Sequence, residues 1–318
     1  MFVTYLTFFS GFAILIAGAQ LLVNGATSIG MKLNISQMVM GLTVVALGTS
    51  LPELIVNIFA GIKGNTDLAI GNILGSNITN TLLVVGAAAL VVPIPFSKKT
   101  LQRDIPFSLF APIILFVLAN DALFGRQDII SRMDGIILLI LLGVFLYFTF
   151  FKQGSSANRP QEEFKQFSWG LSVLFLVLGG LGLYFGGKWI VGGAVTIASA
   201  IGISETAMGL TLVAGATSLP ELATSIIAAR KNNADMALGN AVGSNILNIF
   251  MVLGITSVIK PIPYASSLNI QLGLVLLSGL LLFAFGKLGK NKNTLNRWEG
   301  LAMVLIYIAF VWFTTVFQ

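Results

Sequence analysis

Two stretches of the chain are near copies of each other. The first reads GTSLPE over 48–53 and GNILGSNITN over 71–80, and the second reads ATSLPE over 216–221 and GNAVGSNILN over 239–248. Matched residues are 168 positions apart throughout, as 221 − 53 and 248 − 80 both show, so no gap is needed to align them. Such self-similarity indicates a duplicated structural unit. Each copy also places one acid, Glu53 or Glu221, inside an apolar stretch, where a carboxylate is costly and indicates a functional site.

The composition predicts a membrane protein. Hydrophobic residues make up 56% of the 318 residues and charged residues only 9%, too few to cover the surface of a soluble globular protein. A helix needs about 20 apolar residues to cross about 30 Å of hydrocarbon. We predict ten such transmembrane helices, over 2–24, 37–62, 69–92, 104–120, 133–151, 168–197, 205–229, 236–259, 268–286 and 298–316. The predicted fold class is therefore an all-α integral membrane protein.

A polar stretch over 152–167 separates the two copies. It contains Gly154-Ser155-Ser156 and Arg159-Pro160, a composition typical of linkers. Five predicted helices lie before it, in 1–151, and five after it, in 168–318. Because five is odd, the second half enters the membrane from the opposite side, which predicts two inverted five-helix repeats. Inverted repeats place a substrate site near the midplane, between the halves, and give alternating access when one part moves against the other.

The charge distribution predicts the orientation. Loops on one side hold thirteen Lys and Arg residues and those on the other hold four, Lys63, Arg126, Arg132 and Lys260. The richer side, with the 152–167 linker, is predicted to be cytoplasmic and both termini extracytoplasmic, in a cell (inner) membrane. No basic residue precedes the first span, so we expect it to be a retained helix. Loops facing anionic lipid explain the net charge of +6, and no nucleic-acid partner is expected. Lys188 lies within a predicted span, and its role stays open.

The chain contains no cysteine and no histidine. Thiolate and imidazole are the usual ligands of zinc, copper and iron, so a bound metal must be held by oxygen. Oxygen ligands favour hard cations such as Na⁺, Ca²⁺ or Mg²⁺. The absence of histidine also excludes the Ser-His-Asp arrangement of common hydrolases.

Each glutamate follows a proline, Pro52 or Pro220. Proline removes a backbone donor and clashes with the preceding turn, so we predict that both helices break near the midplane. We expect the breaks to free backbone carbonyls at Ala46, Leu47, Ala214 and Gly215. Free carbonyls are tolerated at membrane depth only where they line a watered cavity, and there they coordinate cations.

Together the halves offer only oxygen ligands. The candidates are the carboxylates of Glu53 and Glu221, the amides of Asn80 and Asn248, the hydroxyls of Thr49, Ser50, Ser76, Thr217, Ser218 and Ser244, and the freed carbonyls. Ca²⁺ takes about six to eight oxygens, and two carboxylates match its charge. Neutral hydroxyl and carbonyl oxygens suit Na⁺, so both ions would compete for one cavity, as antiport requires. Two carboxylates about 4 Å apart repel by roughly 4 kcal/mol at an effective dielectric of 20, so we expect protons to compete too.

At these motifs the chain resembles the cation/Ca²⁺ exchanger superfamily, and most of all its prokaryotic Na⁺/Ca²⁺ exchanger branch. The resemblance extends over the ten-helix pattern. It implies that the side chains named above and the carbonyls of Ala46 and Ala214 are the ion ligands. It also implies electrogenic exchange of about three Na⁺ for one Ca²⁺ and sliding of the first and sixth helices over a stationary core. Some prokaryotic and K⁺-dependent relatives have aspartate at the position of Asn248. The absence of that aspartate here disfavours K⁺ dependence. The second copy also has Gly215-Ala216 where the first has Leu47-Gly48, so the two access paths need not be equivalent.

Other functions stay open at this point. The same acids would support H⁺/Ca²⁺ exchange or K⁺-dependent Na⁺/Ca²⁺ exchange. Paired carboxylates also serve acid–base enzymes, which leaves an intramembrane hydrolase, and a passive cation channel could use the same ligands. We favour a Na⁺/Ca²⁺ antiporter with Ca²⁺ and Na⁺ as transported ions, no cofactor, no enzymatic activity and the bilayer as its surroundings; protein partners are not predicted.

Overall fold

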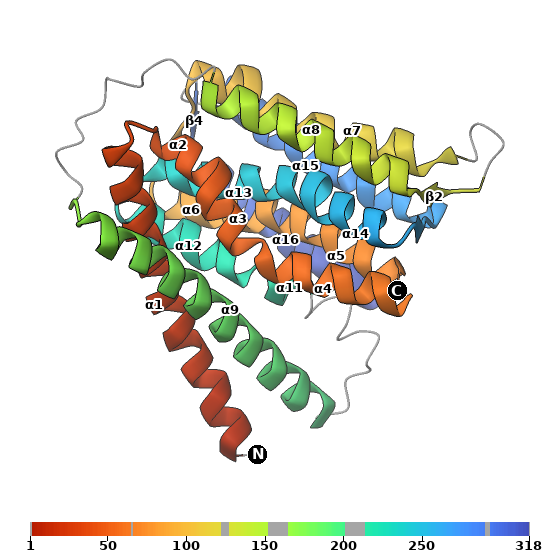
Figure 1. Cartoon of the computed structure of the whole chain (residues 1–318), viewed down its shortest axis with the longest axis horizontal. Helices are drawn as coiled ribbons and strands as arrows, with labels where there is room; N and C mark the ends of the chain where they lie inside the picture. The colour runs from red at the N-terminus through yellow and green to blue at the C-terminus, as the bar shows by residue number, and fades with distance from the viewer. Residues whose placement is uncertain are drawn as a thin grey trace.

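The computed structural model describes residues 2–64, 66–121, 127–151, 165–200, 214–289 and 293–317 (Figure 1). In the first half the helices are α1 (Phe2–Lys32), α2 (Gln37–Met40), α3 (Ala46–Thr49), α4 (Leu51–Lys63), α5 (Thr66–Thr79), α6 (Val85–Val91), α7 (Ile105–Ala119) and α8 (Arg132–Phe151). In the second half they are α9 (Trp169–Ala200), α11 (Ala214–Thr217), α12 (Leu219–Arg230), α13 (Ala234–Leu247), α14 (Gly254–Ile259), α15 (Asn269–Leu288) and α16 (Arg297–Phe317). The described chain is therefore predominantly helical, as predicted.

Short π-helical segments join several of these helices. They are η1 (Gly41–Val45), η2 (Asn80–Val84), η3 (Thr100–Asp104) and η7 (Asn248–Leu253), and a 3₁₀ turn, η8 (Ser266–Leu268), precedes α15. Single π-helical turns occur frequently at functional sites. Here η2 and η7 begin at Asn80 and Asn248, the two amides that the sequence selects as ligands.

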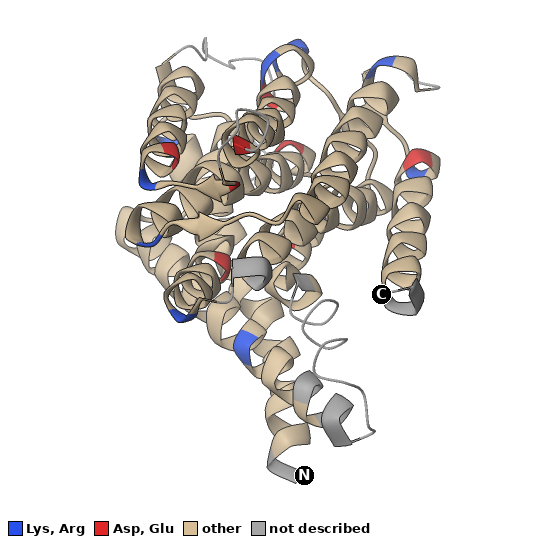
Figure 2. Cartoon of the chain, turned by 90° about the vertical axis from the view of Figure 1, so that its right-hand side faces the viewer, with Lys and Arg blue, Asp and Glu red and all other residues tan. Residues whose placement is uncertain are grey.

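Eight helices in the described ranges are long and apolar enough to cross a membrane, or nine if the bent pair Gln37–Thr49 and Leu51–Lys63 forms one span. The predicted span over 205–229 begins outside the described residues, and α11 with α12 forms its described part. Charged side chains lie mainly near the helix ends, and the central parts of the helices are free of them apart from a few positions (Figure 2). These features confirm a multi-pass membrane protein.

The spans Ala69–Val91 and Ala234–Ile259 form the centre of the molecule. About four-fifths of each is buried, 78% and 83%, against at most 33% for the other six spans. In Figure 1, α13 and α14 lie between α7 and α8 on one side and the helices from α2 to α4 on the other. The duplicated GSN segments therefore lie at the core of the fold, and the remaining helices cover them.

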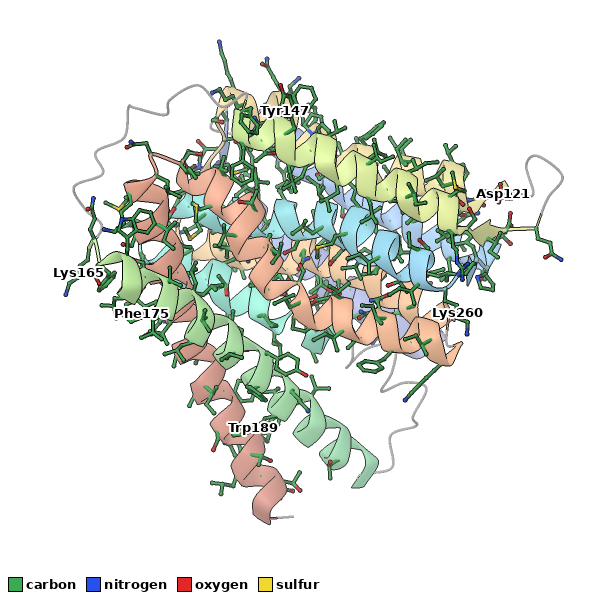
Figure 3. The ribbon with its side chains drawn as sticks, in the orientation of Figure 1. Asp121, Tyr147, Lys165, Phe175, Trp189 and Lys260 are labelled. Atoms are coloured by element: carbon green, nitrogen blue, oxygen red, sulfur yellow. The ribbon has the colours of Figure 1, made fainter. Side chains whose placement is uncertain are left out.

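Helices α1 and α9 pack along each other and extend beyond the rest of the molecule (Figure 1). Glycines allow this close approach. A Cβ atom added at Gly18 would lie 2.7 Å from the backbone nitrogen of Leu183, and one added at Gly182 would lie 2.9 Å from Cα of Gly18. Small residues at helix contacts let backbones approach closely within a membrane. The outer face of the pair carries large side chains such as Trp189 (Figure 3), which suits contact with lipid.

Lys188, whose role the sequence leaves open, is exposed on α9 beside Trp189. Its side chain therefore does not line the buried centre. A lysine at such a position keeps its stem along apolar surface and extends its charge toward the polar interface.

Two short ribbons connect the halves. Strand β1 (Ile94–Pro95) pairs antiparallel with β4 (Thr294–Leu295), and β2 (Ile129–Ile130) pairs antiparallel with β3 (Ile262–Pro263). Each ribbon takes one strand from each half of the sequence. The halves are thus interleaved and do not form separate bodies.

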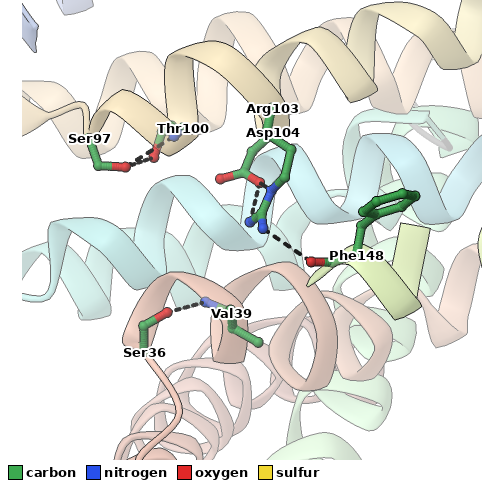
Figure 4. A network of polar contacts seen from close by, with 7 residues as sticks. All are labelled: Ser36, Val39, Ser97, Thr100, Arg103, Asp104 and Phe148. Carbon is green, nitrogen blue, oxygen red and sulfur yellow. Dashed lines mark hydrogen bonds and ion pairs between the residues drawn. The ribbon is translucent and has the colours of Figure 1, made fainter. Parts of the chain in front are cut away.

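Local hydrogen bonds fix several helix starts. The hydroxyl of Ser131 accepts from the backbone N–H of Asp134, and Asp134 accepts from the N–H of Ser131 at 2.7 Å, which is a capping box before α8. Figure 4 shows a similar cap at α2, where Val39 donates to the Ser36 hydroxyl at 3.3 Å. It also shows Arg103, which pairs with Asp104 and donates to the carbonyl of Phe148, joining the start of α7 to the end of α8.

Candidate functional site

Both glutamate-bearing helices break one residue before the Leu-Pro-Glu sequence. In the first half α3 ends at Thr49 and α4 begins at Leu51, with a bend of 46° between the two arms. Ser50 has φ −85° and ψ 5°, outside the helical region. Ser218 lies between α11 and α12 with nearly the same angles, φ −84° and ψ 1°. The predicted breaks are therefore confirmed, and Pro52 and Pro220 lie in the first turns that follow.

The prediction that the break frees the Ala46 carbonyl is wrong in this conformation. That oxygen accepts the backbone N–H of Ser50 at 2.9 Å and the hydroxyl of Thr49 at 3.2 Å. The carbonyl that loses its helical donor is that of Gly48, because Pro52, four residues later, has no N–H.

The two carboxylates are both fully buried. Glu221 accepts hydrogen bonds at Oε1 from the hydroxyls of Ser50 (3.1 Å) and Ser244 (3.2 Å). Ser50 belongs to the same helix break as Glu53, so the break of one half contacts the acid of the other. The sequence predicted this meeting from the duplication.

The threonines of each break reach the other half. Thr49 donates to Oδ1 of Asn240 at 3.1 Å and lies 3.5 Å from the hydroxyl of Ser244. Thr217 donates to Oδ1 of Asn72 at 3.2 Å and lies 3.4 Å from the hydroxyl of Ser76. These reciprocal contacts bring Thr49 beside Ser244 and Thr217 beside Ser76, so each pair takes one residue from each half.

Several buried oxygens of the candidate ligands accept no hydrogen bond among the described residues. They are both oxygens of Glu53, Oε2 of Glu221, Oδ1 of Asn80, Oδ1 of Asn248 and Oγ of Ser218. A buried polar atom without a partner costs about 1–3 kcal/mol, and an unpaired buried charge costs more. Ca²⁺ is coordinated by about six to eight oxygens in proteins, so these six oxygens reach the lower end of that range. The donor set therefore fits a hard cation.

The two asparagines are held differently. Asn248 donates from Nδ2 to Oδ1 of Asn77 at 3.0 Å. Both amide atoms of Asn80 have no partner among the described residues. The two halves therefore present their amides to the site in unequal ways.

Other residues of the site were not selected from the sequence. Asn57 donates to the backbone carbonyl of Glu53 at 3.0 Å, and Asn240 donates to that of Glu221 at 3.2 Å and to the hydroxyl of Ser225 at 3.0 Å. Asn72 accepts from Thr217, as described above. The duplication could have identified Asn72 and Asn240, because they occupy matched positions of the two copies. It could not have identified Asn57, because its matched position holds Ser225.

A membrane-embedded chain with a buried, oxygen-lined pair of carboxylates between two broken helices defines a membrane cation transporter. Comparison with known proteins identifies the family: the model described as sodium/calcium exchanger protein matches residues 3–151 and 171–316. The chain belongs to this family. Its relatives are transporters, so the chain is not classed as an enzyme, and the intramembrane hydrolase that the sequence left open finds no support.

Individual relatives match over nearly the whole chain. The putative antiporter CaxA of Alkalimonas amylolytica is 38% identical, covering 94% of this chain and 95% of the relative. The sodium/calcium exchanger MaX1 of Methanosarcina acetivorans is 33% identical, covering 97% of both. Among solved structures, the sodium–calcium exchanger NCX_Mj with 10 mM Na⁺ and no Ca²⁺ superposes with a TM-score of 0.83 at 34% identity, covering 97% of both chains.

Proposed function

We propose that this protein exchanges Na⁺ for Ca²⁺ across the membrane by alternating access. The observation that carries the proposal is that six buried oxygens of the candidate ligands, three of them on the two fully buried carboxylates, have no hydrogen-bond partner among the described residues. Two carboxylates balance the charge of Ca²⁺, and the surrounding hydroxyl and amide oxygens suit Na⁺. The names of MaX1 and NCX_Mj, both sodium/calcium exchangers, support the same pair of ions.

The proposed ligands come from both halves. They are Glu53, Thr49, Ser50, Ser76 and Asn80 from the first half and Glu221, Thr217, Ser218, Ser244, Asn248 and the Ala214 carbonyl from the second; the Ala46 carbonyl, which accepts two hydrogen bonds, is not among them. The contacts of Ser50, Thr49 and Thr217 with the opposite half support one shared cage. If Na⁺ and Ca²⁺ occupy it in turn, and the empty cage disfavours movement between its two open states, transport of one ion requires countertransport of the other.

The proposed architecture has ten transmembrane helices in two inverted repeats, 1–151 and 168–318, joined by a cytoplasmic linker over 152–167. Both termini are extracytoplasmic in this arrangement. The exchange of strands between the halves supports the inversion: β1 of the first half pairs with β4 of the second, and β2 of the first pairs with β3 of the second. The equal backbone angles of Ser50 and Ser218 support equivalent breaks.

The proposed stoichiometry is about three Na⁺ for one Ca²⁺, which moves one net positive charge per cycle. Ca²⁺ neutralises the two carboxylates, whereas three Na⁺ leave the loaded cage with one excess charge. The neutral oxygens of Thr49, Thr217 and Asn248 are available for the sodium ions that the two acids alone cannot hold. Exchange at this ratio is electrogenic.

Purified protein in liposomes tests the proposal directly. Vesicles loaded with Na⁺ and diluted into choline medium should take up ⁴⁵Ca²⁺, and vesicles without a Na⁺ gradient should not. Clamping the membrane potential with K⁺ and valinomycin should change the initial rate if the exchange is electrogenic. Uptake driven by a pH gradient in the absence of Na⁺ would replace the proposal with H⁺/Ca²⁺ exchange.

The same assay addresses K⁺. A segment of 122 residues, 36% of this chain, is 38% identical to rat sodium/potassium/calcium exchanger 1. We expect replacing choline by K⁺, with the potential clamped, to leave the Ca²⁺ uptake rate unchanged. A requirement for K⁺ would show that Asn248 does not prevent K⁺ cotransport.

A further inference from the structure

One polar contact near the site has no counterpart in the other half. The hydroxyl of Thr79 lies 2.8 Å from the carbonyl of Gly75 and 3.3 Å from the phenol oxygen of Tyr307 in α16. The hydroxyl of Thr79 is the donor in both contacts, so its single proton is shared between the carbonyl of Gly75 and the phenol oxygen of Tyr307.

This contact lies directly beside a proposed ligand. Thr79 is the last residue of α5, and η2 begins at Asn80. The phenol oxygen also lies 3.9 Å from a Cβ position built at Gly215, in the short helix before the second break. The Tyr307 phenol thus contacts the side chain of the residue before Asn80 and lies within van der Waals distance of a side chain built at Gly215.

The duplication shows that this arrangement belongs to one half only. Thr79 and Gly215 match Leu247 and Leu47 at the 168-residue offset. Helices α8 and α16 begin with RMDG and RWEG, 165 positions apart as 297 − 132 shows, so Tyr307 matches Leu142. All three positions of the contact carry leucine in the other half. A hydrogen bond is therefore possible at one end of the cage and impossible at the other.

The asymmetry follows the unequal anchoring of the two amides. Asn248 is held directly by Asn77, while both amide atoms of Asn80 have no partner among the described residues. Asn80 consequently depends on its backbone for its position, and the backbone residue before it is the one that Tyr307 holds.

We propose that Tyr307 is a positioning residue for cation binding: its phenol fixes Thr79 and thereby aims the Asn80 amide oxygen into the cage. The inference rests on the proposed function, since it assigns Asn80 to a bound cation. A hydrogen bond between neutral groups is worth about 0.5–1.5 kcal/mol net, and every 1.4 kcal/mol is a tenfold change, so its loss weakens binding by about two- to tenfold.

The test uses Tyr307→Phe, which removes only the hydroxyl, with Ca²⁺ binding to the purified protein measured by isothermal titration calorimetry in Na⁺-free buffer. We expect the Kd for Ca²⁺ to rise about two- to tenfold. The KM of Na⁺-driven ⁴⁵Ca²⁺ uptake should rise equally, with the rate at saturating Ca²⁺ unchanged. Tyr147→Phe makes the same chemical change on the exposed face of α8 (Figure 3) and should leave both constants at the wild-type value.

Variants at Thr79 separate a positioning role from packing. Thr79→Val should reproduce the effect of Tyr307→Phe. Thr79→Ser should retain wild-type Ca²⁺ binding because it keeps the hydroxyl. The double variant with Thr79→Val and Tyr307→Phe should bind Ca²⁺ no more weakly than either single variant. Additive losses, or wild-type Ca²⁺ binding by both single variants, would overturn the inference and leave the proposed function intact. Failure of the folded wild-type protein to bind Ca²⁺ would overturn both.

Discussion

Glu53→Gln is the most informative single substitution in this protein. Neither carboxylate oxygen of Glu53 accepts a hydrogen bond among the described residues, whereas Oε1 of Glu221 accepts two. Replacing Glu53 therefore removes a charge without breaking a hydrogen bond of the ion-free protein. We expect two effects of opposite sign, one on Ca²⁺ binding and one on stability.

The loss of binding follows from the buried position of the acid. Removing one partner from a buried ionic set costs about 3–5 kcal/mol, and 1.4 kcal/mol is a factor of ten. The Kd for Ca²⁺ should then rise by roughly two to three and a half orders of magnitude. In the ion-free protein the repulsion between the acids disappears, and two unit charges about 4 Å apart repel by roughly 4 kcal/mol at an effective dielectric of 20. The ion-free variant should therefore unfold at a higher temperature than the ion-free wild type.

Both effects can be measured on one preparation. Calorimetric titration at pH 8 gives the Kd for Ca²⁺, and tryptophan fluorescence during heating gives the unfolding temperature with and without a chelator. Glu299→Gln is the control, because Glu299 lies at the start of α16, where it accepts the N–H of Asn296 at 2.7 Å. Binding by Glu53→Gln within threefold of the wild type, or a lower unfolding temperature of the ion-free variant, would refute the assignment of Glu53 to the cage.

Three further outcomes follow from the same structure. Gly18→Val should destabilise the protein, because its side chain would enter the backbone of α9, while Gly180→Ala, with no atom within 4 Å of the new Cβ, should unfold at the wild-type temperature. Asn248→Asp replaces the donor to Asn77 by an acceptor and should cost the ion-free protein about 1–3 kcal/mol of unfolding free energy, a loss that added Ca²⁺ reverses in a chemical denaturation series. Lowering the pH from 8 to 5 should raise the KM for Ca²⁺ and leave the maximal rate unchanged, because protons compete for both acids; a falling maximal rate at constant KM would contradict this.

Local rules were sufficient to predict the elements that carry the site. A proline next to a glutamate inside an apolar span predicted both breaks, and the fixed 168-residue offset predicted that Glu53 and Glu221 serve one site. These features depend on covalent constraints and on repetition, which a sequence displays directly.

The contacts between the halves could not be predicted in the same way. The donation from Thr49 to Asn240 joins residues 191 positions apart, and its geometry depends on how α3 packs on α13. The Ala46 carbonyl was expected to be free because proline removes a donor, but the bend lets Ser50 and Thr49 satisfy it. The orientation of Lys188 likewise depends on which face of α9 packs against α1, and both faces of that helix are apolar.

The crossed contacts have a mechanical consequence for exchange. Thr49 at the first break is tied to Asn240 of the second half, and Thr217 at the second break is tied to Asn72 of the first. A movement that displaces one break therefore strains a hydrogen bond to the opposite half, so the two breaks cannot rearrange independently without losing these bonds. In the proposed exchange, a cation that binds both glutamates would stabilise the arrangement in which all four residues are paired. Occupancy of the proposed cage would then act on both helix breaks at once, which is the coupling that obligatory exchange requires.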